Sequence, residues 1–186
     1  MSKKTNASVA KPIIVLVSTC AVTGLLLGGA HELTKPTIEH NREVAAQEMY
    51  KELIPEAEGF ETCENTHEGV TACMKAKGGH GYVIVAQEKG YGGPVPMAVA
   101  FDQQGKISSV KALQNNETPG LGTKVAEASF VDQFAGKEAQ AMELSDVDAI
   151  TGATISSKAA LGSINDAIGE YQSLDDTNLT KGENDE

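Results

Sequence analysis

The first part of the chain has two apolar patterns in succession, and each predicts a different helix. Residues 12–30 contain no charged side chain. Nineteen helical residues come close to the ~30 Å thickness of the hydrocarbon layer of a bilayer, so this run predicts a transmembrane helix. After Pro36, apolar residues recur at helical spacing between charged ones as far as Ile54. This second pattern predicts an amphipathic helix that ends before Pro55 and links the anchor to the rest of the chain.

Short β-prone runs come next, at residues 81–87, 96–102 and 107–114, separated by glycine-rich or polar connections. They predict antiparallel strands joined by hairpins. A short helix is expected over residues 124–134, and a longer one over residues 155–174, whose apolar side chains from Ile155 onward share one face. Along the chain, the predicted strands therefore come first, and the helices that are expected to cover their sheet follow.

These patterns predict an α+β fold, with an antiparallel sheet and packed helices preceded by one transmembrane helix. The length of 186 residues allows one domain of ordinary size and an appendage, so a single core must carry any chemistry. The expected boundaries are a cytoplasmic N-terminus at 1–11, a transmembrane helix at 12–32, a linking helix at 33–55, a domain at 56–174 and an acidic, flexible tail at 175–186.

Charges around the apolar run predict how it crosses the membrane. Lys3, Lys4 and Lys11 precede it, so the N-terminus is expected in the cytoplasm and the domain outside. One alternative is a cleaved signal peptide, because small residues stand at 28–30, but the run is longer than a signal peptide's apolar region. Another alternative, lipid attachment at Cys20, is disfavoured because ten mostly apolar residues follow this cysteine.

Net charge excludes one class of partner. The chain carries −11 overall, and because residues 1–30 contribute only three lysines, the rest carries −14. Binding of nucleic acid needs a basic surface, which this composition lacks. Aromatic residues make up only 4% with no tryptophan, which also disfavours a stacking surface for bases.

Two cysteines, Cys63 and Cys73, have nine residues between them. Outside the cytoplasm such a pair predicts a disulfide that closes a short loop, with a stabilisation of roughly 3 kcal/mol. His67 and His80 interleave with the cysteines, which leaves a metal site as an alternative. That spacing is not one of the usual zinc patterns, so no metal is predicted.

The candidate site lies directly before the last predicted helix, where residues 148–154 read DAITGAT. The start of a helix has unpaired N–H groups and a partial positive charge, and it therefore suits a phosphate group. Gly152 and Ala153 would let a bulky ligand come close to the backbone. The alternative is that Thr151 or Thr154 only caps the helix.

The stretch from Asp148 to Thr154 matches D-x-x-[ST]-G-A-[ST]. It resembles the acceptor motif of FMN-binding domains, in which the flavin is joined to a Thr or Ser hydroxyl through a phosphodiester. Residues 117–122 read ETPGLG, similar to the loop that precedes the flavin segment in the G subunit of Rnf electron transport complexes and in the C subunit of sodium-translocating NADH:quinone reductases. The anchor and residues 33–38 are similar too, and the short chain with one anchor is typical of the Rnf G subunit.

This resemblance implies specific roles at the motif. Thr154 would hold FMN covalently through its side-chain oxygen, while Gly152 and Ala153 would shape the approach. Thr151 would assist through its hydroxyl, and Asp148 would be needed for attachment. The resemblance also implies a separate flavin transferase that uses FAD as donor and Thr154 as acceptor, and this fits the lack of a nearby His or Lys base that could activate the hydroxyl.

The resemblance also implies that the ETPGLG loop faces the isoalloxazine ring. Its residues expected at the ring are Glu117, Thr118, Gly120 and Leu121. Without the resemblance, this loop would be read as an ordinary turn around Pro119 and Gly120.

The implied function is that of an electron carrier in a membrane complex that couples electron transfer between ferredoxin and NAD to Na⁺ or H⁺ translocation. The other membrane subunits of such a complex are the expected partners, since one anchor cannot form an ion channel. No dinucleotide-binding, P-loop or iron–sulfur motif is present, so FMN is the expected redox centre. The alternatives are the C subunit of the quinone reductase, a stand-alone flavoprotein reductase and an anchored binding module without a cofactor.

Overall fold

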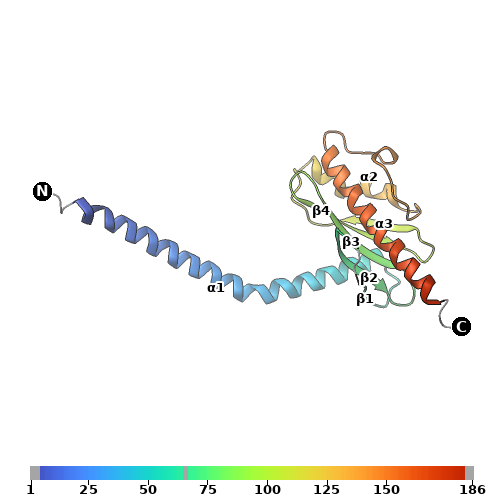
Figure 1. The fold of residues 1–186 in the computed structure, drawn as a ribbon, viewed down its shortest axis with the longest axis horizontal. Coiled ribbons are helices and arrows are strands. Elements are labelled where there is room, and N and C mark those ends of the chain that lie inside the picture. Colours follow the sequence, from blue (N-terminus) through green and yellow to red (C-terminus); the bar gives the residue numbers. More distant parts are fainter. Residues whose placement is uncertain (1–4, 65–66, 183–186) are drawn as a thin grey trace. The chain divides into compact units, whose positions relative to one another are not determined.

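The computed structural model describes residues 5–64 and 67–182. The chain divides into two compact units, Met1–Ala46 and Gln47–Glu186. Residues 1–4 and 183–186, in the predicted cytoplasmic N-terminus and acidic tail, lie outside the described residues. Figure 1 follows the chain from the first helix to the last.

Helix α1, Thr5–Leu53, includes both the predicted transmembrane segment and the predicted linking helix. It continues through Pro12 and Pro36, so the expected start of a second helix after Pro36 is not seen. A proline inside a helix removes one backbone hydrogen bond without necessarily ending the helix. The stretch Lys11–Leu53 is long and apolar enough, by length and composition, to cross a membrane, with a mean hydropathy of 2.2 in its most apolar window.

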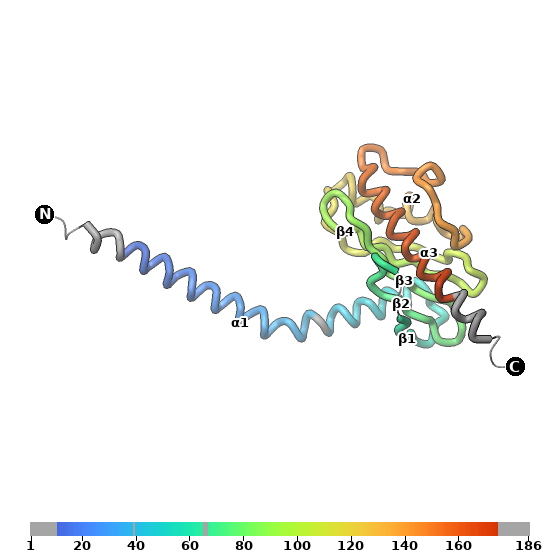
Figure 2. The backbone as a smooth tube through the Cα atoms, in the orientation of Figure 1, coloured from blue at the N-terminus to red at the C-terminus, as the bar shows by residue number. Residues whose placement is uncertain are grey.

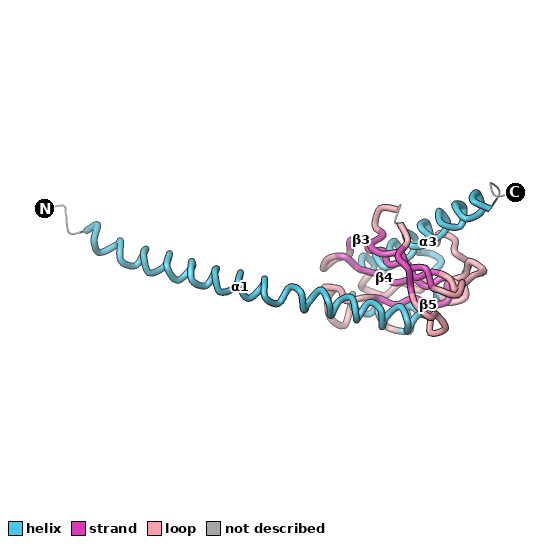
Figure 3. The backbone as a smooth tube through the Cα atoms, turned by 90° about the horizontal axis from the view of Figure 1, so that it is seen from below, coloured by secondary structure: helices cyan, strands magenta, loops and turns pink. Residues whose placement is uncertain are grey.

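The second unit is built on a five-stranded sheet that is visible in Figures 1 and 3. Its strands follow one another in space in the order of the sequence, and each neighbouring pair is antiparallel. They are β1 (Phe60–Thr62), β2 (Val70–Ala76), β3 (Tyr82–Lys89), β4 (Pro94–Phe101) and β5 (Ile107–Ala112). The three predicted strands are confirmed as β3, β4 and β5. Strands β1 and β2 were not predicted, because their residues alternate too weakly between apolar and polar.

Helix α3, Thr154–Gly182, crosses one face of the sheet (Figure 2). Its apolar side chains pack with those of β3 and β4, and Tyr171 stacks on Phe101 with ring centroids 4.6 Å apart. The predicted helix over residues 155–174 is confirmed, but the helix continues to Gly182. Neither proline nor glycine occurs between Gly169 and Gly182 to stop it.

The helix predicted over residues 124–134 is divided into three short turns. These are η1 (Gly122–Ala126), α2 (Ala128–Val131) and η2 (Asp132–Phe134), and a further turn, η3, spans Leu144–Asp146. The division falls at Glu127, whose extended backbone, with ψ of 146°, interrupts the helical path. Phe130 and Phe134 from this segment are buried in the core, so packing rather than helix propensity determines its shape.

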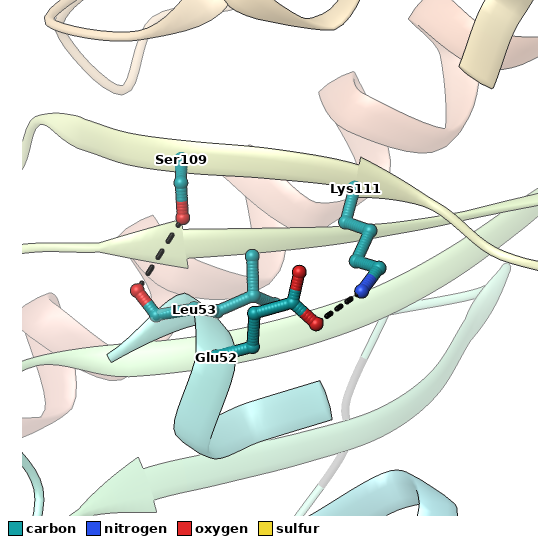
Figure 4. Close-up of polar contacts among 4 residues, drawn as sticks. All are labelled: Glu52, Leu53, Ser109 and Lys111. Atoms are coloured by element: carbon teal, nitrogen blue, oxygen red, sulfur yellow. Dashed lines mark hydrogen bonds and ion pairs between the residues drawn. The ribbon is translucent and has the colours of Figure 1, made fainter. Parts of the chain in front are cut away.

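The last turn of α1 is part of the domain and contacts β5 (Figure 4). The Ser109 hydroxyl donates a hydrogen bond of 3.4 Å to the carbonyl of Leu53, and Lys111 forms an ion pair with Glu52. Tyr50 is buried, with its ring 5.5 Å from that of Phe60. The domain is therefore fastened to the end of the helix that leads to it.

Candidate functional site

A cavity of about 480 Å³ opens where two loops and the start of α3 meet. This volume is within the range of sites that bind cofactors and other small molecules. Its walls come from three stretches that are far apart in the sequence: the loop between β3 and β4, the loop between β5 and η1, and the start of α3. The lining residues are Tyr91, Glu117, Thr118, Leu121, Gly122, Gly152, Ala153, Thr154, Ile155 and Ser156.

A tight turn delivers the backbone to the start of α3. The N–H of Ala153 donates to the carbonyl of Ile150 at 3.0 Å, and Gly152 has a φ of +80°. Glycine adopts this left-handed conformation without steric cost, at the position where a type II turn requires it. The Ser157 hydroxyl locks the turn from behind, because it accepts the N–H of Ile150 at 3.0 Å and donates to the carbonyl of Ala153.

Thr154 is the first residue of α3, and its side chain is exposed at the cavity. Among the described residues its hydroxyl has no hydrogen-bond partner. Among the described residues the Thr154 hydroxyl accepts no N–H of the helix, so the structure does not support the alternative that Thr154 caps α3. A free hydroxyl beside the unpaired N–H groups of a helix start is available to a phosphate.

Glu117 connects the three walls of the cavity. Its side chain is only 4% exposed, and the carboxylate accepts the N–H of Gly92 at 2.9 Å and the hydroxyl of Ser156 at 2.7 Å. Glycine at position 122 leaves room for this carboxylate, because a Cβ there would lie 2.5 Å from Oε2 of Glu117. Glu117 thus lines the cavity as predicted, but its charge is directed at the protein.

Apolar side chains line the mouth of the cavity. Tyr91, Leu121 and Ile155 are 74%, 40% and 55% exposed. In the described part of the domain, residues 47–64 and 67–174, they are the only large apolar side chains that are exposed, and all three line this cavity. Exposed apolar side chains that gather at one cavity mark a binding site.

The remaining residues of the predicted site lie around the cavity. The loop at Thr118 turns through Gly120, which has a φ of +73°, and the Thr118 carbonyl accepts the N–H of Leu121 at 3.1 Å. Gly120, Thr151 and Asp148 are exposed but do not line the cavity. The backbone N–H of Asp148 donates to the side chain of Gln133 at 2.8 Å, which holds the start of the motif in place.

Sequence reasoning missed four residues that line the cavity: Tyr91, Gly122, Ile155 and Ser156. Ile155 was expected on the buried face of the last helix, but in the first turn that face opens onto the cavity. An exposed tyrosine between glycines, in the sequence GYGG at residues 90–93, was the signal that could have identified Tyr91.

Cys63 and Cys73 lie at β1 and β2, outside the cavity, and both are free. The disulfide expected between them stays a prediction. In the part of the chain that the structure describes, no group of three or more His, Cys, Asp or Glu side chains is arranged to hold a metal ion.

Comparison with known proteins agrees with this site. A family model described as an FMN-binding domain matches residues 90–169, and this stretch includes every residue that lines the cavity. The fold is thus that of an FMN-binding domain. The residues present fit such a cofactor, since a helix start with a free hydroxyl faces a cavity with an apolar mouth.

Individual relatives show to which family of FMN-binding proteins the chain belongs. The chain is 30% identical over 160 residues to the G subunit of the proton-translocating ferredoxin:NAD(+) oxidoreductase complex of Clostridium ljungdahlii, covering 82% of this chain and 86% of the relative. It is 28% identical over 188 residues to the G subunit of the Na(+)-translocating complex of Acetobacterium woodii, covering 87% and 90%. A solved structure, the C subunit of the Na(+)-translocating NADH-quinone reductase of Parabacteroides distasonis, is 22% identical with a TM-score of 0.46, covering 55% and 60%. The chain belongs to the family of G subunits of ion-translocating ferredoxin:NAD(+) oxidoreductase complexes.

Proposed function

We propose that this protein is the flavin-carrying G subunit of an ion-translocating ferredoxin:NAD oxidoreductase complex, with FMN joined covalently to Thr154. The observation that carries the proposal is the exposed, unbonded hydroxyl of Thr154 at the first residue of α3, open to the cavity. The family to which the chain belongs supports the cofactor, and the position of the hydroxyl supports the linkage.

The start of α3 suits the phosphate. A phosphodiester at Thr154 would place negative charge beside the first N–H groups of the helix, which have no partner within the helix. The partial positive charge of a helix N-terminus stabilises an anion there. Gly152 keeps the approach open, because the only atom within 4 Å of a Cβ at that position is Cδ1 of Leu121, at 3.4 Å.

The apolar mouth of the cavity suits the isoalloxazine ring of FMN. Tyr91, Leu121 and Ile155 provide exposed apolar surface around the attachment point. The covalent link would fix one end of the cofactor, and these side chains would cover the faces of its ring. When bound, FMN supplies one- and two-electron chemistry, while this chain's residues hold it and exclude water.

Attachment requires a second protein. The described residues that line the cavity include neither His nor Lys, and the one carboxylate, Glu117, is engaged with Gly92 and Ser156. The base that removes the proton from the Thr154 hydroxyl would therefore come from a flavin transferase. With FAD as donor, the Thr154 oxygen forms a bond to the phosphorus of the FMN half, the pyrophosphate bond breaks, and AMP leaves.

The membrane segment gives the carrier its location. We infer a single span within α1 with Lys3, Lys4 and Lys11 on the cytoplasmic side and the domain outside. A fusion of alkaline phosphatase to the C-terminus, which is active only outside the cytoplasm, tests this orientation. One span cannot enclose an ion path, so the other membrane subunits of the complex would move Na⁺ or H⁺ while this subunit relays electrons.

The deciding experiment follows fluorescence of the protein band in an unstained denaturing gel, after expression together with a flavin transferase. We expect wild type and Thr154→Ser to fluoresce and to be heavier by one FMN unit in intact mass, because both retain a hydroxyl. Thr154→Ala should be dark. Thr151→Ala is the companion variant: it removes a neighbouring exposed hydroxyl that does not line the cavity, and because Thr151 is expected only to assist, this variant should still carry flavin, at a lower level.

Three results would overturn the proposal. A fluorescent Thr154→Ala would place the linkage at another residue. A dark wild type in cells where the transferase labels a known substrate would favour the anchored binding module. Loss of label in Thr151→Ala alone would move the acceptor three residues toward the N-terminus.

A further inference from the structure

A pair of cysteines lies where β1 ends and β2 continues beyond it. The β1–β2 register pairs Phe60 with Ala76 and Thr62 with Met74, so the next residues, Cys63 and Cys73, are opposite one another. The N–H of Cys63 donates to the carbonyl of Cys73 at 2.9 Å, which holds the two residues side by side across the strands. Directly opposite residues of antiparallel strands have Cα atoms ~4.5–5.5 Å apart, within the range that a disulfide spans.

From this geometry we propose that Cys63 and Cys73 form an intramolecular disulfide in the mature protein. The proposal depends on the extracytoplasmic location inferred above, because disulfides persist in oxidising compartments. It does not depend on the flavin.

The two sulfur atoms differ in environment. Cys73 is fully buried in the core and Cys63 is half-buried. Burial raises the pKa of the Cys73 thiol, and the neighbouring Cys63 and the carboxylate of Glu170 act in the same direction. Cys63 is therefore the sulfur that an external reagent reaches first, while Cys73 is protected.

The reaction is a thiol–disulfide exchange with a disulfide oxidase of the extracytoplasmic space. The Cys63 thiolate attacks the oxidase disulfide, which forms a mixed disulfide and releases one oxidase thiolate. The Cys73 sulfur then attacks the sulfur of Cys63, and the second oxidase thiolate leaves. Two protons leave the cysteines and two electrons pass to the oxidase. The second step is easier while Cys73 is not yet buried, so the bond should form as the domain folds.

The disulfide would join the two ends of the segment between Cys63 and Cys73, whose last residues belong to β2. This segment is fastened to the rest of the domain by the N–H of His67, which donates to the buried carboxylate of Glu170 at 2.8 Å, and by the carbonyl of Gly69, which accepts the N–H of Gln87 at 2.9 Å. A disulfide between Cys63 and Cys73 restricts the unfolded chain and so stabilises this arrangement in the folded domain.

The test counts free thiols in the full-length protein. Cells are quenched with acid, the membranes are dissolved in denaturing detergent, and N-ethylmaleimide is added before and after reduction. The third cysteine, Cys20, is the internal standard. We expect one maleimide adduct before reduction and two more afterwards. Cys63→Ser should show two adducts before reduction and no more afterwards.

Each other outcome overturns the disulfide. Three adducts before reduction would show free thiols, and a reduction-sensitive dimer in the gel would show an intermolecular bond. As an independent measurement, reduction should lower the Tm of wild type by about 10 °C and leave Cys63→Ser/Cys73→Ser unchanged. Flavin fluorescence of the same band separates the two proposals: a fluorescent band with three free thiols contradicts only the disulfide, and a dark band with one free thiol contradicts only the flavin linkage.

Discussion

Replacement of Glu117 by alanine should loosen the cavity even though the carboxylate is directed away from it. The side chain is 4% exposed, and it accepts hydrogen bonds from the N–H of Gly92 and the hydroxyl of Ser156. Alanine removes both, and thereby disconnects the loop between β3 and β4 from the start of α3. Ser156, itself 3% exposed, is left with a buried hydroxyl that has lost its acceptor.

The magnitude follows from these contacts. A hydrogen bond to a charged group contributes about 1.5–3 kcal/mol. Removal of two such bonds, offset by the desolvation of the carboxylate that no longer has to be buried, should cost about 3 kcal/mol. For a domain of this size that corresponds to a fall in Tm of about 10 °C.

Glu117→Gln is the matched control. Its amide oxygen can accept the Gly92 N–H while its amide nitrogen donates to the Ser156 oxygen, so the shape and both contacts persist without the charge. We expect it to lose about 1 kcal/mol and to retain most of its flavin. Ser156→Ala completes a double-mutant cycle with Glu117→Ala, and the coupling energy should be about 1–2 kcal/mol.

The assay combines thermal unfolding of the purified protein with flavin fluorescence per mole of protein. Glu117→Ala should lower both readings, and Glu117→Gln should lower neither by much. If Glu117→Ala unfolds within about 1 °C of wild type, the carboxylate does not hold the walls together. A Glu117→Gln protein with wild-type Tm but a displaced flavin absorption band would instead place the charge against the ring.

Three further predictions address the turn before α3, the partly buried Asp166 and the helix that leads to the domain. Gly152→Ala, at a φ of +80°, should cost about 1–2 kcal/mol in thermal unfolding and reduce flavin labelling. Burial raises the pKa of Asp166, with Glu88 adding to the effect, and its Oδ2 has no partner among the described residues. Its charged form therefore destabilises the fold at neutral pH, so Asp166→Asn should raise the Tm at pH 7, and this gain should disappear as the pH falls toward 3.8, the ordinary pKa of an aspartate. Glu52→Ala, which breaks an exposed ion pair, should cost less than about 1 kcal/mol, whereas Tyr50→Ala should cost about 3 kcal/mol because that ring is buried; urea titration of the free energy of unfolding distinguishes them.

The elements that the sequence predicted well are those whose local pattern agrees with their packing. Strands β3 to β5 alternate or are apolar throughout, and turns rich in glycine or polar residues separate them, so both signals indicate hairpins. Strand β1 is only three residues long, with two of them exposed, and no local pattern distinguishes it from a loop. The residues after Gly122 favour a helix. Phe130 and Phe134 are buried in the core, however, and their packing there divides the segment into short turns.

The site was predictable where it is contiguous in the sequence and not where it is assembled in space. Residues 148–154 and 117–122 each contain their own motif, and the structure brings Thr154 and Glu117 to one cavity. The contribution of Tyr91 depends on the turn between β3 and β4, which no local motif relates to the other two segments. The role of Ser156 also became evident only from the structure, because its hydroxyl donates to the carboxylate of Glu117, 39 positions away in the sequence.

The position of Thr154 on α3 bears on how steadily the domain would hold the cofactor under the proposed linkage. If the residue that holds the cofactor lay on a mobile loop, the position of the cofactor would vary. A residue on a packed helix is held more accurately. Ala160 and Ile164 fix α3 in the core within three turns of Thr154, and both are fully buried. The hydroxyl therefore takes its position from the core, while Tyr91 and the loop of Glu117 close the cavity around it. On the same domain, the last turn of α1 is fastened to β5 through Ser109. If FMN is joined to Thr154 as proposed, its point of attachment is therefore held by the packed core of the domain, as an electron carrier needs if its cofactor is to keep one position within the domain.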